Sequence, residues 1–405
     1  MLEKFIHLDQ TSEQFPLMDT SLYFVNPQMI LNTSTCREKI LLSVTPKLKD
    51  ELLFGLHMHP GGVYPRFNRN HSNFKLSPSP IYSFLPNLVN FKNLSFDDVT
   101  DNRALELQDK VSSFNKVYLF WSGGIDSTVI LAAILKNWNK ESIQKLIIVL
   151  NKYSVEENSN MYHNYIHEKI NTISTDLFFS GKANFSHDAV YVDGNVGDSV
   201  SYLCLAEFDK MYPGYYKKPW KQNWRILIEF FSKYQNQQYG LSMYKQIVES
   251  LEFNNLEIET INDFLWWLTF NWLHDKLLYN ILWQYTPCFF SNPNIDTKKF
   301  LEENMFQWFN SDDYQNWTVS TIGTTLRIGD DISTNKYSFK TYIFNFDNNY
   351  DYYKYKLKEA STPKNIVKDN HIILCAIDTE YNYYYRYTHE KTWPPKNEHT
   401  EKTSR

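Results

Sequence analysis

Residues 122–127, Ser-Gly-Gly-Ile-Asp-Ser, bring together residue types that bind phosphate. Glycines let the backbone approach an anion closely because no Cβ stands in the way. The hydroxyls of Ser122, Ser127 and Thr128 add hydrogen-bond donors. Asp126 is the exception, since a carboxylate beside phosphates is repulsive unless a cation such as Mg²⁺ lies between them. The predicted phosphate loop consists of Ser122, Gly123, Gly124, Ile125, Asp126, Ser127 and Thr128.

The segments on either side of this loop are the elements that must position it. Residues 117–121 form a short apolar and aromatic run typical of a buried strand. Residues 128–138 place apolar side chains at helical spacing. A strand, a glycine turn and a helix in that order create an anion site, because the helix start leaves N–H groups unpaired and its dipole favours negative charge. The GxxxxGK[ST] pattern of a Walker loop is absent, and no Lys follows the glycines.

A second glycine turn follows about 70 residues later. Gly194, Gly197 and Asp198 come after a short predicted strand at 189–193, and a helix is expected over 199–208. Residues 145–150 are a further buried strand. Strands and helices in this alternation predict a doubly wound, mostly parallel α/β sheet, in which ligands bind outside the carboxyl ends of the strands.

The first loop resembles the SGGxDS loop of the N-type ATP pyrophosphatases, or PP-loop enzymes, without departure from the motif. In that family the loop holds the β,γ-pyrophosphate of ATP while a substrate oxygen attacks the α-phosphorus, which gives an adenylated substrate and pyrophosphate. The resemblance implies ATP and Mg²⁺ as cofactors and a catalytic, metal-contacting role for Asp126. It also implies a sheet of the adenine nucleotide alpha hydrolase-like kind.

The turn at 194–198 resembles the GEGADE-like turn of asparagine synthetases and the GELGDQ-like turn of related stand-alone proteins. The resemblance implies that Asp198 contacts Mg²⁺-pyrophosphate. Asn195 stands where those families have a Glu that is linked to substrate handling and proton transfer. An amide carries no charge and cannot act as a base, so the step after adenylation stays open.

The family also places a Lys or Arg of the following half near the α-phosphate, where it would stabilise developing negative charge. Arg327, Lys336 and Lys340 fall in that part of the chain, and Lys340 is our candidate for the catalytic cation. Position 2 is Leu rather than the exposed cysteine of an N-terminal glutaminase, so that domain is not expected.

Three functions follow from these motifs and remain open. The leading one is an asparagine synthetase-like amide ligase that adenylates a substrate oxygen, by expectation a carboxylate, before attack of ammonia or an amine. The second adenylates a nucleobase or tRNA carbonyl. The third is a degenerate PP-loop protein that binds only a nucleotide or a partner, for which Asn195 is the main argument. Neither the acceptor substrate nor the oligomeric state is specified by the sequence.

The composition and charge of the chain restrict these three hypotheses. The 405 residues carry a net charge of −5, which gives no overall attraction to nucleic acid or anionic membranes. Basic residues interleaved with aromatics at 208–221 are typical either of nucleic-acid contacts or of a solvated loop with buried rings. Four dispersed cysteines without a CxxC pair suit a reducing cytosol. With no signal-peptide core and no long apolar run, we expect a cytoplasmic protein without membrane contact.

The expected domains are an N-terminal α+β region at 1–110, the PP-loop domain at 111–290, an extension completing it at 291–390 and a disordered tail at 391–405. Ser95, with Asp98 three residues later, is expected to cap a helix at 96–114. His163 and His167 lie four apart on a predicted helix, but Asn164 replaces the Glu of HExxH, which favours a solvated face over a zinc site. The other expected elements are strands at 21–25, 371–378 and 381–387 and helices at 156–170 and 261–284.

Overall fold

The chain forms two compact units, Ser83–Ser361 and a unit made of Met1–Tyr82 with Thr362–Arg405. We describe each by itself. Helix α4 (Phe96–Val111), nearly all of which falls in the expected N-terminal region at 1–110, belongs to the larger unit. The computed structural model describes residues 20–25, 94–178, 186–201, 205–233, 237–254, 256–272, 274, 277, 300, 303–329, 336–356, 373–378 and 383–388.

The larger unit is built on a five-stranded, all-parallel sheet, which confirms an α/β fold. Its strand order is β4-β3-β2-β5-β6. The strands are β2 (Lys116–Phe120), β3 (Leu146–Leu150), β4 (Asn171–Ser174), β5 (Ala189–Asp193) and β6 (Met305–Gln307).

Apolar side chains on both faces explain why these short segments pair in parallel, because parallel sheets are covered on both sides. On one face, Tyr118 stacks on Tyr191 with ring centroids 5.3 Å apart, in a cluster that Phe178 completes. On the other face, Val117 and Leu119 are fully buried.

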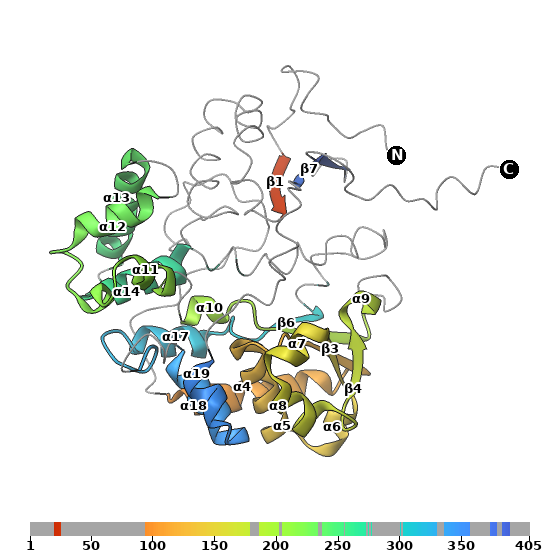
Figure 1. Cartoon of the computed structure of the whole chain (residues 1–405). Helices are drawn as coiled ribbons and strands as arrows, with labels where there is room; N and C mark the ends of the chain where they lie inside the picture. Colours follow the sequence, from red (N-terminus) through yellow and green to blue (C-terminus); the bar gives the residue numbers. More distant parts are fainter. Residues whose placement is uncertain are drawn as a thin grey trace. The chain divides into compact units, whose positions relative to one another are not determined.

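Three helices pack together in the larger unit and include the one that follows the phosphate loop (Figure 1). They are α4 (Phe96–Val111), α5 (Ile125–Asn137) and α18 (Tyr337–Asp347). The predicted cap of α4 is confirmed: the Ser95 hydroxyl accepts a bond from the backbone N–H of Asp98, and the Asp98 carboxylate accepts one from the backbone N–H of Ser95. Nine of the 13 residues of helix α5 are buried, namely all of 125–134 except Asp126, so the helix that follows the loop is packed into the core.

The strand order places a topological switch between β2 and β5. Strands β3 and β4 lie on one side of β2, whereas β5 and β6 lie on the other. Chains that leave the carboxyl ends of the two central strands diverge and open a crevice there, the usual ligand position in such sheets. Both glycine turns leave the sheet at this point, because the first follows β2 and the second follows β5.

A group of helices follows the second turn (Figure 1). Its elements are α11 (Leu205–Met211), the 3₁₀ turn η4 (Tyr215–Lys217), α12 (Trp224–Ser232), α13 (Gln237–Phe253) and α14 (Ile261–Trp267). The helix expected at 261–284 starts as predicted and continues as a π turn, η5 (Leu268–Trp272); most of its remainder lies outside the described residues. Among the described residues, no helix is long and apolar enough to cross a membrane.

Strands β4 and β6 were not predicted. Strand β4 reads Asn-Thr-Ile-Ser and β6 has only three residues, so neither carries an apolar run that marks a buried strand. The helix expected at 156–170 is broken into α7 (Lys152–Glu157), α8 (Ser159–Met161) and the π-helical η2 (Tyr162–Ile166).

The smaller unit contains a three-stranded antiparallel sheet in the order β1-β7-β8. Its strands are β1 (Thr20–Val25), β7 (Ile373–Asp378) and β8 (Tyr383–Thr388), which confirms the three strands expected in these places. Most of the expected region 1–110 and the whole tail at 391–405 lie outside the described residues.

Candidate functional site

The first glycine turn has a backbone that only glycine fits. Gly123 adopts φ +78°, and a Cβ there would lie 2.3 Å from the Ser154 carbonyl oxygen of helix α7. Helix α5 begins at the N-cap Gly124, which offers no side chain to cap the first turn. The loop therefore stays close to its neighbour while the positive end of the helix dipole points to the crevice.

The loop hydroxyls mainly hold the loop together. Ser127 Oγ accepts a bond from the Ser122 backbone N–H at 3.1 Å and lies 3.1 Å from Ser122 Oγ. The Thr128 hydroxyl is fully buried and accepts a 3.2 Å bond from Trp121 Nε1. Ile125 is also buried. Ser122, Gly124 and Asp126 keep partial exposure and form the accessible edge of the predicted site.

The second turn packs directly against the first helix. A Cβ on Gly197 would lie 2.5 Å from Asp126 Oδ1, and one on Gly194 would lie 3.0 Å from Ile130 Cδ1. The turn closes with a 2.9 Å bond from the Gly197 N–H to the Gly194 carbonyl, and the short helix α10 (Gly197–Val200) follows. Both glycines are thus needed to bring Asp126 next to Asp198.

Lys336 joins these two carboxylates. Its ammonium donates to both Asp126 oxygens at 2.5 Å and to Asp198 Oδ1 at 2.8 Å. The lysine side chain is 1% exposed, whereas those of Asp126 and Asp198 are 22% and 13% exposed. Three segments far apart in the sequence therefore converge on one cation position.

The contacts of Lys336 with the two carboxylates offset several unfavourable features of its position. Burial lowers the pKa of the ammonium, but the Asp126 and Asp198 carboxylates outweigh burial and raise the pKa above its usual value. The residue has φ +62° in the left-handed region, which is strained for a non-glycine residue. It also precedes the first turn of α18, where a positive charge opposes the helix dipole. The two carboxylates stabilise an arrangement that the backbone disfavours.

The predicted catalytic cation, Lys340, lies one helical turn beyond Lys336 and is buried. Its backbone N–H donates to the Lys336 carbonyl at 3.0 Å. The Lys336 ammonium makes the contacts to Asp126 and Asp198 that place a cation beside the loop, and the catalytic role of Lys340 stays a prediction. Sequence spacing did not distinguish the two lysines, because the left-handed N-cap that turns Lys336 inward has no residue signature.

Asp193, at the end of β5, is a buried carboxyl group that the sequence did not single out. Its Oδ1 accepts a 2.9 Å bond from the Asn195 N–H, while Oδ2 is buried without a partner among the described residues. Burial, with a smaller contribution from Asp126, raises the pKa of Asp193 to about 7. Asn195 itself is half-buried in the turn, and its backbone rather than its side chain makes this contact.

A second ion pair borders the loop. Lys356 donates to Glu157 Oε1 at 2.9 Å, and both side chains are nearly buried. Gly124 lies so close that a Cβ there would stand 3.4 Å from the same Glu157 oxygen. Helix α19 (Tyr350–Tyr355) is tied to the loop as well, because the Tyr352 hydroxyl donates to the Gly123 carbonyl at 3.1 Å. No sequence motif signalled these residues.

The donor set fits Mg²⁺. Magnesium is commonly held by one or two carboxylates together with substrate phosphates, and Asp126 and Asp198 already converge on a cation position. In the described part of the chain, no three His, Cys, Asp or Glu residues are arranged to hold a metal among themselves. The His163 and His167 rings lie 5.9 Å apart at η2. An ion at Asp126 and Asp198 would complete its coordination with water or with phosphates of a substrate.

The structure thus brings Ser122–Ser127, Gly194, Gly197 and Asp198 into one site at the switch point and adds Lys336 to it. Comparison of the chain with protein-family models, curated protein sequences and solved structures found no match.

Proposed function

We propose that the protein is an ATP-dependent, AMP-forming ligase of the asparagine synthetase-like PP-loop kind, with a sheet of the adenine nucleotide alpha hydrolase-like type. One observation carries the proposal: the carboxylates of Asp126 and Asp198 meet at a cation position beside a glycine loop on the crevice of a parallel sheet. Phosphates that carry Mg²⁺ are commonly held by N–H donors at a helix start, together with one or two carboxylates that contact the metal.

In this proposal the loop residues Ser122–Thr128 bind the β,γ-pyrophosphate of ATP. Asp126 and Asp198 would hold Mg²⁺, which supplies positive charge against the phosphates. Lys336 supplies a further positive charge close to both carboxylates. A substrate oxygen attacks the α-phosphorus, the bond between the α-phosphorus and the α,β-bridging oxygen breaks, and pyrophosphate leaves with the negative charge that these groups stabilise. A carboxylate substrate becomes an acyl-adenylate, and ammonia or an amine then displaces AMP.

Nucleic acid is the second acceptor class, and one observation favours it. Tyr215 and Trp224 expose 41% and 39% of their surface on the helical group after the site. The Arg225 guanidinium lies 5.2 Å from the Trp224 ring centroid. Exposed rings with cations are suited to stacking on unpaired bases. By contrast, Tyr216 and Trp220 of the same segment are buried.

ATP–pyrophosphate exchange tests the proposal and separates the acceptor classes. Labelled pyrophosphate should enter ATP only when the correct acceptor is present, since adenylation must run in both directions. Pools of carboxylic acids and amino acids form one arm, and nucleosides with tRNA form the other. If no pool supports exchange while Mg·ATP still binds, the ligase proposal fails and the nucleotide-binding reading replaces it.

Asp126→Ala tests the assigned site within the same assay. Loss of a metal-contacting carboxylate should lower exchange by about 100-fold or more, comparable to removal of one preorganised charge contact. Asp109→Ala, at an exposed position of α4, is the matched control and should leave exchange unchanged. Full exchange activity in Asp126→Ala would refute the site.

A further inference from the structure

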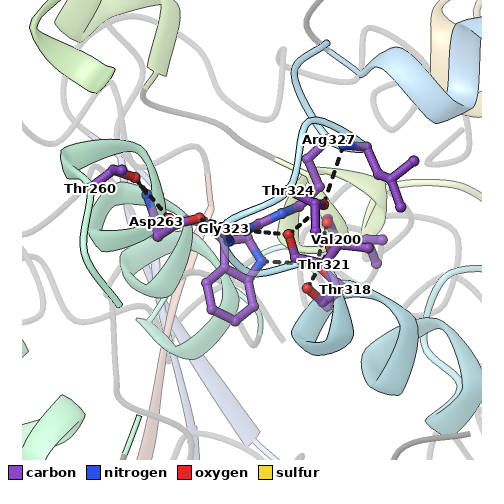
Figure 2. A network of polar contacts seen from close by, with 10 residues as sticks. Val200, Thr260, Asp263, Thr318, Thr321, Gly323, Thr324 and Arg327 are labelled. Carbon is purple, nitrogen blue, oxygen red and sulfur yellow. Dashed lines mark hydrogen bonds and ion pairs between the residues drawn. The ribbon is translucent and has the colours of Figure 1, made fainter. Parts of the chain in front are cut away.

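A buried ion pair lies in the larger unit and takes no part in the proposed chemistry. Arg327 Nη2 donates to Asp263 Oδ1 at 2.6 Å, and the side chains are 0% and 2% exposed (Figure 2). Desolvation makes a buried pair a poor source of stability, since apolar residues of similar size often replace one without loss. The pair therefore needs an explanation other than stability, and the groups around it supply one.

The carboxylate of Asp263 is held in one orientation by the start of α14. Its Oδ2 accepts a 2.8 Å bond from the Thr260 hydroxyl, and its backbone N–H donates to the same hydroxyl at 3.2 Å. Figure 2 shows Thr260 on one side of Asp263, with Arg327 reached through the other oxygen. The aspartate of the pair is thus anchored to the start of a helix, and the Gly323 N–H approaches its Oδ1 at 3.5 Å from the loop that carries Arg327.

The backbone of the arginine segment sets where helix α18 begins. The Arg327 carbonyl accepts a 3.0 Å bond from the Tyr337 N–H, and the Leu326 carbonyl accepts bonds from the N–H and hydroxyl of Ser338 at 3.1 and 2.6 Å. Tyr337 and Ser338 immediately follow Lys336. The guanidinium also donates to the Thr321 carbonyl at 3.3 Å and lies 4.6 Å from the Trp266 ring centroid, which fixes its own position.

The same cluster reaches the helix that carries Asp198. The Thr318 hydroxyl donates to the Val200 carbonyl at 2.6 Å and accepts a 2.9 Å bond from Trp266 Nε1 (Figure 2). Val200 is the last residue of α10 and lies two positions after Asp198. One buried network therefore contacts the backbone beside two of the three charged groups of the candidate site.

We propose that Asp263 and Arg327 are positioning residues, which hold the Lys336 ammonium between Asp126 and Asp198 by fixing the start of α18 against α14. The left-handed backbone of Lys336 makes such support necessary, because a strained conformation persists only when its surroundings determine it. The catalytic meaning of this positioning rests on the proposed function, whereas the positioning itself does not.

Amine acylation followed by peptide mass mapping tests the positioning without any nucleotide. In the wild-type protein Lys336 is buried against two carboxylates and should react slowly. In Arg327→Met it should react about tenfold faster, which corresponds to about 1.4 kcal/mol. Lys340, equally buried on the same helix, is the internal control and should change by less than about twofold. Unchanged protection of Lys336 in a folded Arg327→Met protein would overturn the inference.

Two further variants separate positioning from general destabilisation. Asp263→Asn combined with Arg327→Met should expose Lys336 no more than Arg327→Met alone, because both residues act through one contact. Arg327→Lys keeps the charge without the planar fork and should restore part of the protection; it also serves if Arg327→Met does not fold. Equal exposure of Lys336 and Lys340 in every variant would show a merely structural pair and contradict the proposal.

Calorimetric titration with Mg·ATP links the positioning to the proposed function. Arg327→Met should bind Mg·ATP about tenfold more weakly than the wild type, in step with the release of Lys336. If the wild type shows no Mg·ATP binding but Lys336 is still released selectively, the proposed function fails and the positioning role stands. If the wild type binds Mg·ATP and Lys336 stays protected in Arg327→Met, the positioning role fails and the proposed function stands.

Discussion

At the scale of the residue, the site is organised by one ammonium group among carboxylates. Lys336 supplies a single positive charge to the two carboxylates of Asp126 and Asp198, so the three groups together carry excess negative charge. In the proposed function, this excess of negative charge would attract a divalent cation that arrives with phosphates. The charge balance also makes Lys336 important for stability before any ligand binds.

Replacement of this lysine tests that balance. Lys336→Met leaves two neighbouring carboxylates without their cation and should lower the free energy of unfolding by about 3 kcal/mol, as when one partner of a buried pair is removed. Mg²⁺ should restore part of the loss, by about 2.7 kcal/mol at a hundredfold excess over its dissociation constant. Urea unfolding in EDTA and in Mg²⁺ measures both effects.

The matched control is Lys356→Met. Among the ion pairs of the described residues, Lys356 pairs with Glu157 and not with either aspartate. Its loss should destabilise the protein without creating a response to Mg²⁺. If Lys336→Met gains no more stability from Mg²⁺ than Lys356→Met does, the two aspartates do not form a cation site.

A second residue-scale prediction concerns Asp193 and pH. Burial raises its folded-state pKa to about 7, so the folded protein holds a proton that the unfolded chain releases near pH 4. Stability should therefore fall as pH rises from about 4 to about 7, because the folded state binds more protons in that window. Above about pH 7 the contribution of the Asp193 proton to the free energy of unfolding, on the order of a few kcal/mol, is completely lost, and the stability no longer changes through this group.

Asp193→Asn should remove this part of the pH dependence, since its amide cannot titrate. Urea midpoints are measured at several pH values between 5 and 8.5. The midpoint of the wild type should fall up to about pH 7 and then level off, whereas that of the variant should lack this fall. Asp109→Asn, on the exposed side of α4, should keep the wild-type slope. A variant slope equal to that of the wild type would mean that Asp193 is ionised in the folded protein.

At the scale of the element, the position of the loop after β2 depends on one close approach, between Gly123 and helix α7. Gly123→Ala places a methyl group 2.3 Å from the Ser154 carbonyl oxygen and adds the strain of φ +78°. Gly214→Ala has a similar φ of +75° but no heavy atom within 4 Å of the new methyl group. Gly214→Ala should therefore lower the free energy of unfolding by about 1–2 kcal/mol. Gly123→Ala should lower it by more, because the contact with Ser154 adds to the backbone strain.

Thermal unfolding of the two variants isolates the contact from the backbone strain. Mg·ATP titration adds a second measurement, in which Gly214→Ala should behave as the wild type and Gly123→Ala should bind more weakly. Equal losses of stability in both variants would show that α7 moves away easily and does not fix the loop.

At the scale of the whole molecule, every residue of the candidate site falls within the larger unit. The site extends from Ser122 to Lys356, and the unit spans Ser83–Ser361. We therefore expect a fragment of residues 83–361 to bind Mg·ATP within about threefold of the full chain, a difference below about 1 kcal/mol. Calorimetry on both proteins measures this. A folded fragment that fails to bind would mean that the smaller unit contributes to the site.

The sequence was sufficient for the centre of this unit and insufficient for its edges. Strands β2, β3 and β5 carry long buried runs, and the glycines of both turns mark where the backbone must be close-packed, so the carboxyl-end site could be predicted. Strand β4 is short and polar and was missed. The choice of Lys336 over Lys340 depends on a left-handed N-cap and on contacts with residues 210 and 138 positions away, which local patterns do not encode.

The pairing of β1 with β7 has a consequence for synthesis on the ribosome. Val25 and Ile373 are partners across the smaller sheet, and the entire larger unit lies between them in the chain. At about 5–20 residues per second, β1 waits on the order of tens of seconds for its neighbour to emerge. The larger unit can collapse during that interval, so the edge of β1 that pairs with β7 lacks this partner until residues 373–378 have been made. Such an edge is a ready target for chaperones and for intermolecular pairing.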